Sequence, residues 1–205
     1  VEYSSEPDAG SNVGTDILVV TITDTVAPVV TITGGTTLGG ECAVPLTLPD
    51  ATAADDCDAG VTTAAVSDLD GLDVSDPAVG VYNVEYAATD ASSNTGTDIL
   101  VVTITDTTGP VINLIGSDPL DWECAVPWVD PGATADDACE GDVSGSISVG
   151  GDTVDVNNLG GTYVITYDAQ DSVSNAAVQE TRTVNIVDTT PPVVTITGGN
   201  TLGGE

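Results

Sequence analysis

The chain has 205 residues, of which 33 are acidic, one is basic and none is histidine, so its formal net charge at pH 7 is −32. This charge excludes nucleic acid and acidic membranes as partners, because both would be repelled. Without histidine or lysine the chain has no imidazole base and no Ser-His or Ser-Lys nucleophile system, and one arginine cannot form a phosphate clamp. We therefore expect that the protein is not an enzyme.

Internal repeats organise the chain. The motif DTVAP begins at Asp24, DTTGP at Asp106 and DTTPP at Asp188, so this marker recurs every 82 residues, and ECAVP recurs at the same interval. The marker predicts two full repeats, about 25–106 and 107–188. Residues 1–24 are then the C-terminal part of a preceding repeat, and residues 189–205 the N-terminal part of a following one.

The predicted elements of each repeat are strands. Val- and Thr-rich runs such as ILVVTITD, separated by Gly, Pro, Asp and Asn, are strand and turn signals, and no stretch has sustained helical spacing. In chain order, the strands predicted for the second repeat are 111–115, 120–124, 132–135, 145–149, 153–156, 162–169 and 178–187. About seven strands in about 82 residues are typical of a small immunoglobulin-like β-sandwich, and we expect an all-β chain of tandem sandwiches, arranged as beads on a string.

The second repeat also carries a family resemblance. Its segments TGPVINLIGSDPLDWEC, DPGATADDACEGDVS, GTYVITYDAQDSVSN and TRTVNIVD follow one another in an order that resembles the bacterial immunoglobulin-like repeats of secreted and surface proteins. They are more loosely similar to hyalin-repeat domains. The resemblance implies a β-sandwich module of a stalk, adhesin or filament, without catalytic residues. The chain departs from the commoner pattern by placing a cysteine pair in each repeat.

The four cysteines are equally spaced in the two repeats. Cys42 and Cys57 lie in the first repeat, Cys124 and Cys139 in the second, and fourteen residues separate each pair. A lone pair is too few for a zinc site, so the spacing favours one disulfide within each repeat over buried free thiols. Disulfides indicate an oxidising, extracellular setting, and a loop of this size would gain about 3 kcal/mol in the chain-entropy model.

Many acidic residues keep the same phase in the two repeats. Two interpretations remain open: carboxylates scattered for solubility, or oxygen ligands gathered for Ca²⁺. The marker Asp, the acidic loop and the D-x-x-x-N turn supply the candidate ligands. They are Asp24, Asp55, Asp56, Asp58 and Asp90 at the first junction, and Asp106, Asp136, Asp137, Glu140 and Asp171 at the second.

A topological argument favours Ca²⁺ binding. We expect a hairpin at Gly34-Gly35 to return the second strand to the linker end of the repeat, near Cys42, where the acidic loop would begin. The last strand must start at that same end to reach the next linker, so the turn that opens with Asp90 lies there too. Three acidic elements would then converge between repeats, and a shared divalent ion would stiffen the array. The sequence has no EF-hand pattern.

The aromatic residues are expected to be structural. Tyr86 and Tyr167 occupy the place where a sandwich commonly has a packing tyrosine. Trp122 and Trp128 occur only in the second repeat, where core or flank packing is favoured over an exposed binding anchor.

Together these features predict a structural segment of an extracellular filament or surface stalk, stiffened by intradomain disulfides and interdomain Ca²⁺, that self-associates into a fibre or array. The sequence shows no transmembrane run, and we expect no direct membrane insertion. The alternative function is a glycan- or host-protein-binding module of a bacterial adhesin or secreted enzyme. An exposed aromatic patch on one sheet would favour that alternative.

Overall fold

A computed structural model describes residues 1–195, which form two compact units that divide between Thr105 and Asp106. Apart from one short 3₁₀ turn, the regular structure of residues 1–195 consists of strands. The last ten residues of the predicted partial repeat 189–205 lie outside the described part of the chain.

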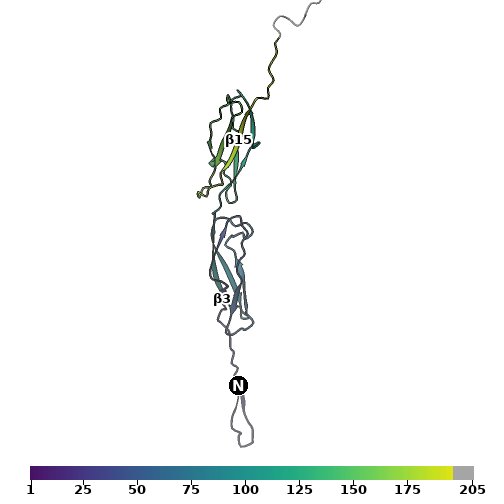
Figure 1. The fold of residues 1–205 in the computed structure, drawn as a ribbon. Coiled ribbons are helices and arrows are strands. Elements are labelled where there is room, and N and C mark those ends of the chain that lie inside the picture. Colours follow the sequence, from purple (N-terminus) through teal and green to yellow (C-terminus); the bar gives the residue numbers. More distant parts are fainter. Residues whose placement is uncertain (196–205) are drawn as a thin grey trace, which may run out of the picture. The chain divides into compact units, whose positions relative to one another are not determined.

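The first unit, in which Figure 1 labels β3, contains eight strands. β1 and β2 form an antiparallel pair, and the other six form one sheet in the order β3-β5-β6-β7-β8-β4. Their bounds are Glu2–Ser4 for β1, Thr15–Ile17 for β2, Val29–Ile32 for β3, Thr37–Glu41 for β4, Ala51–Ala54 for β5, Thr63–Asp68 for β6, Gly80–Thr89 for β7 and Thr95–Thr105 for β8.

The long strands β7 and β8 supply the core of this unit. Buried and exposed positions alternate along both strands, because successive side chains of a strand point to opposite faces. The inward positions are Val84, Tyr86 and Ala88 on β7 and Leu100, Val102 and Ile104 on β8, all of them buried. The predicted packing role of Tyr86 is thereby confirmed, and its hydroxyl donates to the Pro49 carbonyl oxygen at 2.7 Å.

The predicted hairpin at Gly34-Gly35 is wrong. β4 pairs in parallel with β8, and the chain of antiparallel pairs from β3 through β5, β6 and β7 to β8 gives β3 the same direction as β8. β3 and β4 therefore run in the same direction, and the chain between them changes its pairing partner without reversing. Gly34 and Gly35, with φ of 89° and 114°, supply the left-handed backbone that this offset requires.

The second unit has two separate sheets, ordered β10-β15-β14-β13 and β12-β11-β9. Their bounds are Val111–Leu114 for β9, Leu120–Glu123 for β10, Ala133–Asp137 for β11, Gly141–Asp142 for β12, Ser148–Gly151 for β13, Thr162–Asp168 for β14 and Glu180–Val187 for β15. The 3₁₀ turn Ser144–Ser146 occupies the start of the strand predicted at 145–149, and 153–156, also predicted as a strand, is irregular. β10 pairs in parallel with β15, as β4 does with β8 in the first unit.

The core of the second unit is a cluster of side chains from both sheets. Ile112 and Ala135 come from one sheet, and Ile165, Tyr167, Val184 and Ile186 from the other. Trp122 and Trp128 are half-buried and pack against this cluster, with an edge-on arrangement of their rings at a centroid distance of 4.9 Å. Both tryptophans and Tyr167 thus have the predicted structural role.

Arg182, the single basic side chain of the sequence, is fully buried in this core. Its Nη1 forms an ion pair with Asp130 Oδ1 at 2.8 Å, and its Nη2 donates to the carbonyl oxygens of Ile115 and Gly132. Tyr167 donates its hydroxyl to the same Asp130 oxygen at 2.7 Å, and its ring lies 5.6 Å from the guanidinium carbon. The buried charge is therefore paired and hydrogen-bonded at both terminal nitrogens, as burial of an ion requires, while Nε is buried without a hydrogen-bond partner.

Candidate metal centre

Three carboxylates of the second unit meet at the end where β11 finishes. One oxygen each of Asp106, Asp137 and Asp171 lies within 4.8 Å of the others. Asp106 is the first residue of the unit, Asp137 is the last residue of β11, and Asp171 opens the turn that precedes β15. Segments far apart in the sequence thus place three acidic groups at one point.

Asp137 carries an unsatisfied oxygen in this cluster. Its side chain is 5% exposed, its Oδ1 accepts the backbone N–H groups of Cys139 and Glu140 at 2.8 and 3.1 Å, and its Oδ2 is buried without a hydrogen-bond partner. A buried anionic oxygen without a donor is costly, so such a group ordinarily has a cation or a donor beside it. The donor set consists of hard oxygen atoms, which suits Ca²⁺.

The turn from Asp171 to Asn175 orients the other two carboxylates. Asp171 Oδ1 accepts the backbone N–H groups of Val173 and Asn175, and the Asn175 side-chain amide donates to Asp171 Oδ2 at 2.7 Å. The same amide reaches Asp106, with its Nδ2 3.3 Å from the backbone oxygen and 3.4 Å from Oδ1. Asn175 therefore fixes the linker residue against the turn, and Ser174 adopts a left-handed φ of 76° to close it.

Close packing holds the linker in this position. A Cβ atom on Gly109 would lie 2.2 Å from the carbonyl oxygen of Ala176, a distance that real contacts do not reach. Glycine is required there because the backbones of the linker and the turn approach one another directly.

The first unit has an equivalent arrangement. Asp24, Asp55 and the thiol of Cys57 offer ligand atoms within 4.8 Å of one another, and Asp55 Oδ2 is again buried without a partner. The Asn94 side chain donates to Asp90 Oδ2 at 2.7 Å and lies 3.4 Å from the Asp24 carbonyl oxygen. Burial raises the pKa of the Asp90 carboxyl, but the hydrogen bonds from Asn94, Ser92 and Ser93 outweigh it and hold the pKa below its usual range.

Five predicted ligands have other roles or positions. One of them, Asp90, is outside the groups of metal-binding geometry found in residues 1–195, although its counterpart Asp171 belongs to one. Asp58 and Glu140 accept backbone N–H groups from Ala91 and Ser172, so they connect the acidic loop to the turn. Asp56 and Asp136 are outside the groups of metal-binding geometry found in residues 1–195, and Asp136 is exposed on the outer face of β11. Alternation along the strand explains this: Asp137 points inward, so its neighbour points outward.

The predicted disulfides within each repeat are wrong. Cys42 and Cys139 are disulfide-bonded, whereas Cys57 and Cys124 are free thiols, so neither Cys42–Cys57 nor Cys124–Cys139 is formed. The reason is the parallel course of β3 and β4. Cys42 follows β4 and donates its backbone N–H to Thr105 at the end of β8, while Cys57 belongs to the acidic cluster beside the turn that precedes β8.

Two features of the clusters were missed in the sequence. Cys57 lies beside Asp24 and Asp55, and the charge of Asp24, then burial, then Asp55 raise the pKa of its thiol. A further acidic group joins Glu123, Cys124 and Asp188 at the other end of the second unit. The fixed spacing of each cysteine from a marker aspartate was the signal available in the sequence, since Asp24 precedes Cys57 by the same interval as Asp106 precedes Cys139.

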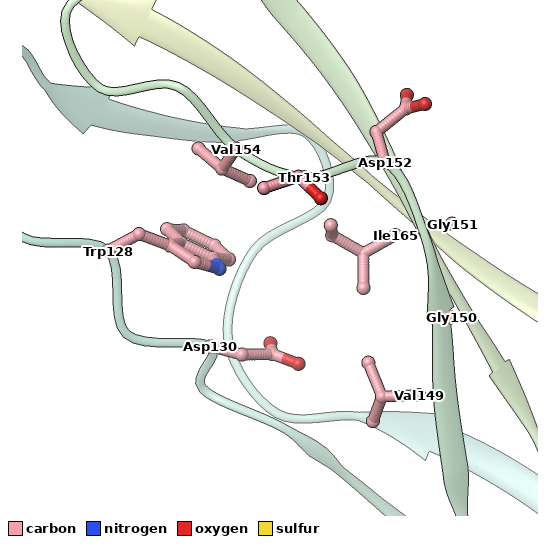
Figure 2. Close-up of a pocket in the computed structure, with 9 residues that line it drawn as sticks. All are labelled: Trp128, Asp130, Val149, Gly150, Gly151, Asp152, Thr153, Val154 and Ile165. Carbon is pink, nitrogen blue, oxygen red and sulfur yellow. The ribbon is translucent and has the colours of Figure 1, made fainter.

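A shallow pocket also lies on the second unit (Figure 2). Its volume is about 350 Å³, with Trp128 and Asp130 on one side and Val149 and Ile165 on the other, while the Asp152 carboxylate points away. Oδ1 of Asp130 already accepts hydrogen bonds from Tyr167 and Arg182. The only aromatic side chain that lines this pocket is therefore Trp128, which is half-buried and packs against the core.

A family model and several known proteins are similar to parts of this chain. Residues 112–186 match the family model described as bacterial surface protein, Ig-like domain. An uncharacterised 81.3 kDa protein of Acholeplasma phage L2 is 34% identical over 161 residues, which are 76% of this chain and 21% of the phage protein. The chain thus spans about a fifth of the length of that relative.

Three solved structures are also similar. A lipoprotein of Bacteroides thetaiotaomicron is 32% identical, with 40% of this chain and 39% of the lipoprotein covered and a TM-score of 0.32. The fibronectin(III)-like modules of Clostridium thermocellum CbhA are 16% identical, with coverages of 78% and 95% and a TM-score of 0.30. The cadherin domains 1–5 of protocadherin gamma B2 are 12% identical, with coverages of 91% and 45% and a TM-score of 0.41.

The family match gives the setting of the protein. Within residues 1–195 no helix is long and apolar enough to cross a membrane. The matched domain is one of bacterial surface proteins, so the chain is extracellular or at the cell surface, as predicted. The all-β, immunoglobulin-like fold and the resemblance to bacterial immunoglobulin-like repeats are likewise confirmed, and residues 112–186 are the part of the chain that the bacterial surface Ig-like family covers.

Proposed function

We propose that this chain is a non-catalytic structural segment of an extracellular filament or surface stalk, and that each of its repeats binds Ca²⁺ at the end where the chain enters. The observation that carries the proposal is a buried carboxylate oxygen without a hydrogen-bond partner, which occurs in both units. Asp55 Oδ2 and Asp137 Oδ2 occupy equivalent places in two units, and both are buried without a partner beside further ligand groups.

The spacing of the ligands suits a shared ion. Two oxygens bound to one Ca²⁺ at about 2.4 Å are at most about 4.8 Å apart, which is the range found among Asp106, Asp137 and Asp171. Backbone oxygens and water would complete the six to eight ligands that Ca²⁺ takes. The ion would also remove the mutual repulsion of three carboxylates held at this distance.

Binding at this place would stiffen the chain. Asp106 stands at the start of the linker 106–110, and Asn175 and Gly109 already tie that linker to the turn. An ion that joins Asp106 to Asp137 adds a third restraint, while Pro110 restricts the backbone beyond it. A structural chain of repeats would then have linkers that are ordered in Ca²⁺ and looser without it.

The first test is calorimetric titration and thermal unfolding of the wild-type chain and of its Asp137→Asn and Asp136→Asn variants. The amide of D137N keeps the oxygen that accepts from Cys139 but replaces the orphan anionic oxygen with an N–H donor, so we expect one Ca²⁺ site to be lost. Asp136→Asn removes the same charge one residue away and should leave Ca²⁺ binding unchanged. At a Ca²⁺ concentration of about 100 times Kd, the wild-type unit should gain about 2.7 kcal/mol, and D137N little or none of it.

A purely structural role of Asp137 predicts a different pattern. D137N would then be less stable than the wild type in chelator, with an unchanged response to Ca²⁺. Absence of binding heat and of any Ca²⁺-dependent shift in Tm in the wild type would refute the Ca²⁺ proposal. Hydrogen exchange of the linker 106–110, slower with Ca²⁺ than with chelator, would report the stiffening directly.

Electron microscopy of the native material addresses the filament. Long uniform fibres are expected, whereas isolated modules attached to another domain would support the alternative, a glycan- or protein-binding module of an adhesin or secreted enzyme. The contacts of Trp122 and Trp128 with each other and with the core favour the structural role, because a binding surface would leave such rings available.

A further inference from the structure

The two cysteine positions of the repeat lie at opposite ends of each unit. Cys42 and Cys124 donate their backbone N–H groups to Thr105 and Val187, the last residues of β8 and β15. We call these the exit cysteines. Cys57 and Cys139 follow β5 and β11 and stand beside Asp55 and Asp137 in the acidic clusters, and we call them the entry cysteines.

The length of the last strand holds the exit and entry cysteines of one repeat far apart. In the first unit the entry cluster includes the turn from Asp90 to Asn94, which directly precedes β8, and β8 then runs for 11 residues to the exit cysteine. At about 3.3 Å per residue this strand is about 35 Å long, while the Cα atoms of a disulfide are about 4.4–6.8 Å apart. In the second unit the 8 residues of β15 intervene in the same way. An exit and an entry cysteine of the same repeat therefore cannot bond.

Both classes nevertheless form disulfides in this chain. Cys42, an exit cysteine, is disulfide-bonded, and so is Cys139, an entry cysteine, whereas their counterparts Cys124 and Cys57 are free thiols. Each free thiol thus occupies a position whose equivalent in the other repeat is bonded. Neither thiol is sealed in the core, since Cys57 is exposed and Cys124 half-buried.

We propose that Cys57 and Cys124 are attachment points for a further copy of this repeat, and that each bonds the cysteine of the opposite class, exit to entry. The test of this bond uses a second copy of the chain as the partner, so that Cys57 of one copy meets Cys124 of the other. Repetition of this bond gives a covalent head-to-tail polymer. Like-with-like bonds would instead give alternating head-to-head and tail-to-tail junctions, with Cys57 joined to Cys57 and Cys124 to Cys124.

The reaction is a disulfide exchange with an external disulfide oxidant. The thiolate of one cysteine attacks the oxidant, one half of which leaves as a thiolate, and the second cysteine then attacks the mixed disulfide and releases the other half. Two protein S–H bonds are lost and one S–S bond forms. The two electrons and two protons pass to the oxidant, which becomes two thiols.

The acidic surroundings determine the conditions of the test. Cys57 stands beside Asp24 and Asp55, and Cys124 beside Glu123 and Asp188, so approaching ends repel each other at low ionic strength. The oxidation is therefore run in high salt, with and without Ca²⁺. The covalent bond does not depend on the Ca²⁺ proposal, and polymer formed in high salt with chelator would support the disulfide alone.

The decisive experiment compares Cys57→Ser and Cys124→Ser, each alone and mixed, in a buffer of oxidised and reduced glutathione. The wild-type chain should give a ladder of multimers that reductant collapses to monomer. Each variant alone should stay monomeric, since it keeps only one of the two free cysteines. The equimolar mixture should give dimers and lose every larger species, and peptide mapping should find Cys57 joined to Cys124.

Three results would overturn the proposal. Dimers of either variant alone in the amount seen for the mixture would indicate unspecific thiol oxidation. A wild-type chain that stays monomeric with both thiols intact would show that no partner docks. A wild-type monomer in which both thiols have disappeared would show an internal bond. In native material, a fall in chain length on reduction would assign the bond to separate chains, and an unchanged length to repeats within one chain.

Discussion

Arg182 distinguishes the second repeat from the first. Its counterpart one repeat earlier is Leu100, and the counterpart of its partner Asp130 is Leu48, so one repeat has a buried ion pair where the other has two leucines. Burial of an ion pair contributes little net stability compared with apolar side chains, but removal of one partner leaves a buried charge without compensation.

We predict that Arg182→Leu lowers the free energy of unfolding of the second unit by about 3–5 kcal/mol. The double variant Asp130→Leu/Arg182→Leu should recover most of this loss, because it recreates the pair found in the first repeat. Urea unfolding of both variants measures the difference. Equal losses in the single and double variants would show that the guanidinium contributes through packing and its bonds to Ile115 and Gly132, rather than through charge compensation.

Glu123 gives the stability of the second unit an acid-sensitive component. The hydroxyl and N–H of Thr189, then Thr190, donate to its carboxylate and lower its pKa from 4.5 to about 2. A folded-state pKa below the unfolded value means that the stabilisation is complete above pH 4.5 and is lost as the pH falls from 4.5 through 2.

Glu123→Gln should therefore be less stable than the wild type at pH 7, and the difference should shrink as the pH falls through this window. Thermal unfolding of both chains between pH 7 and pH 2 measures it. Taking the difference between two chains cancels the protonation of the other carboxylates. A difference that does not change with pH would contradict the role assigned to the Thr189 and Thr190 donors.

The sequence predicts the packing tyrosines and the phase of the acidic residues, because both depend on local patterns that repeat. It could not predict the burial of Arg182, since an arginine is ordinarily exposed and its three acceptors are contributed by segments far from it in sequence. It likewise grouped Asp136 and Asp137 together, because the direction of each side chain depends on where β11 begins.

Among the elements, the linker is the one whose position depends most on a single residue. The backbone at Gly109 touches the carbonyl of Ala176, whereas Gly145 in the 3₁₀ turn has open space at its Cβ position. A methyl group at 109 forces the linker away from the turn and from Asn175.

Gly109→Ala should destabilise the second unit by about 1–3 kcal/mol, the usual cost of overpacking. It should also weaken Ca²⁺ binding, because Asp106 moves with the linker. Gly145→Ala is the matched control and should be neutral in both respects. Calorimetry provides Tm and Ca²⁺ affinity on the same samples, and a G109A chain that matches G145A would show that the linker adapts without loss.

Strand existence was largely predictable, and strand direction was not. Val- and Thr-rich runs between turn residues identified β9, β14 and β15 to within a few residues. Two consecutive glycines, however, are compatible both with a hairpin and with a change of pairing partner without reversal. Only pairing over a long sequence separation, β4 with β8, decides between them. The end of the unit at which Cys42 lies followed from that choice.

For the molecule as a whole, the wrong direction predicted for β4 led to wrong disulfide pairs. It did not affect the predicted convergence of the carboxylates. β5 and β11 still end beside the turns that precede β8 and β15, so the acidic convergence survives. The cysteine spacing was equal in both repeats for a different reason from the one inferred: each repeat presents one sulfur at each end. Sequence spacing measures distance along the chain and carries no information about which end a residue reaches.

The parallel pairing of β4 with β8 and of β10 with β15 also determines how a repeat responds to tension. The chain enters a unit shortly before the first of these strands and leaves it directly after the second, and the two are hydrogen-bonded side by side. Pulling on the two ends of the unit slides these strands along each other, so the load is shared by all hydrogen bonds of the ladder at once. A module connected in this way yields by shear rather than by peeling, and its resistance to force is set by the length of one short parallel ladder.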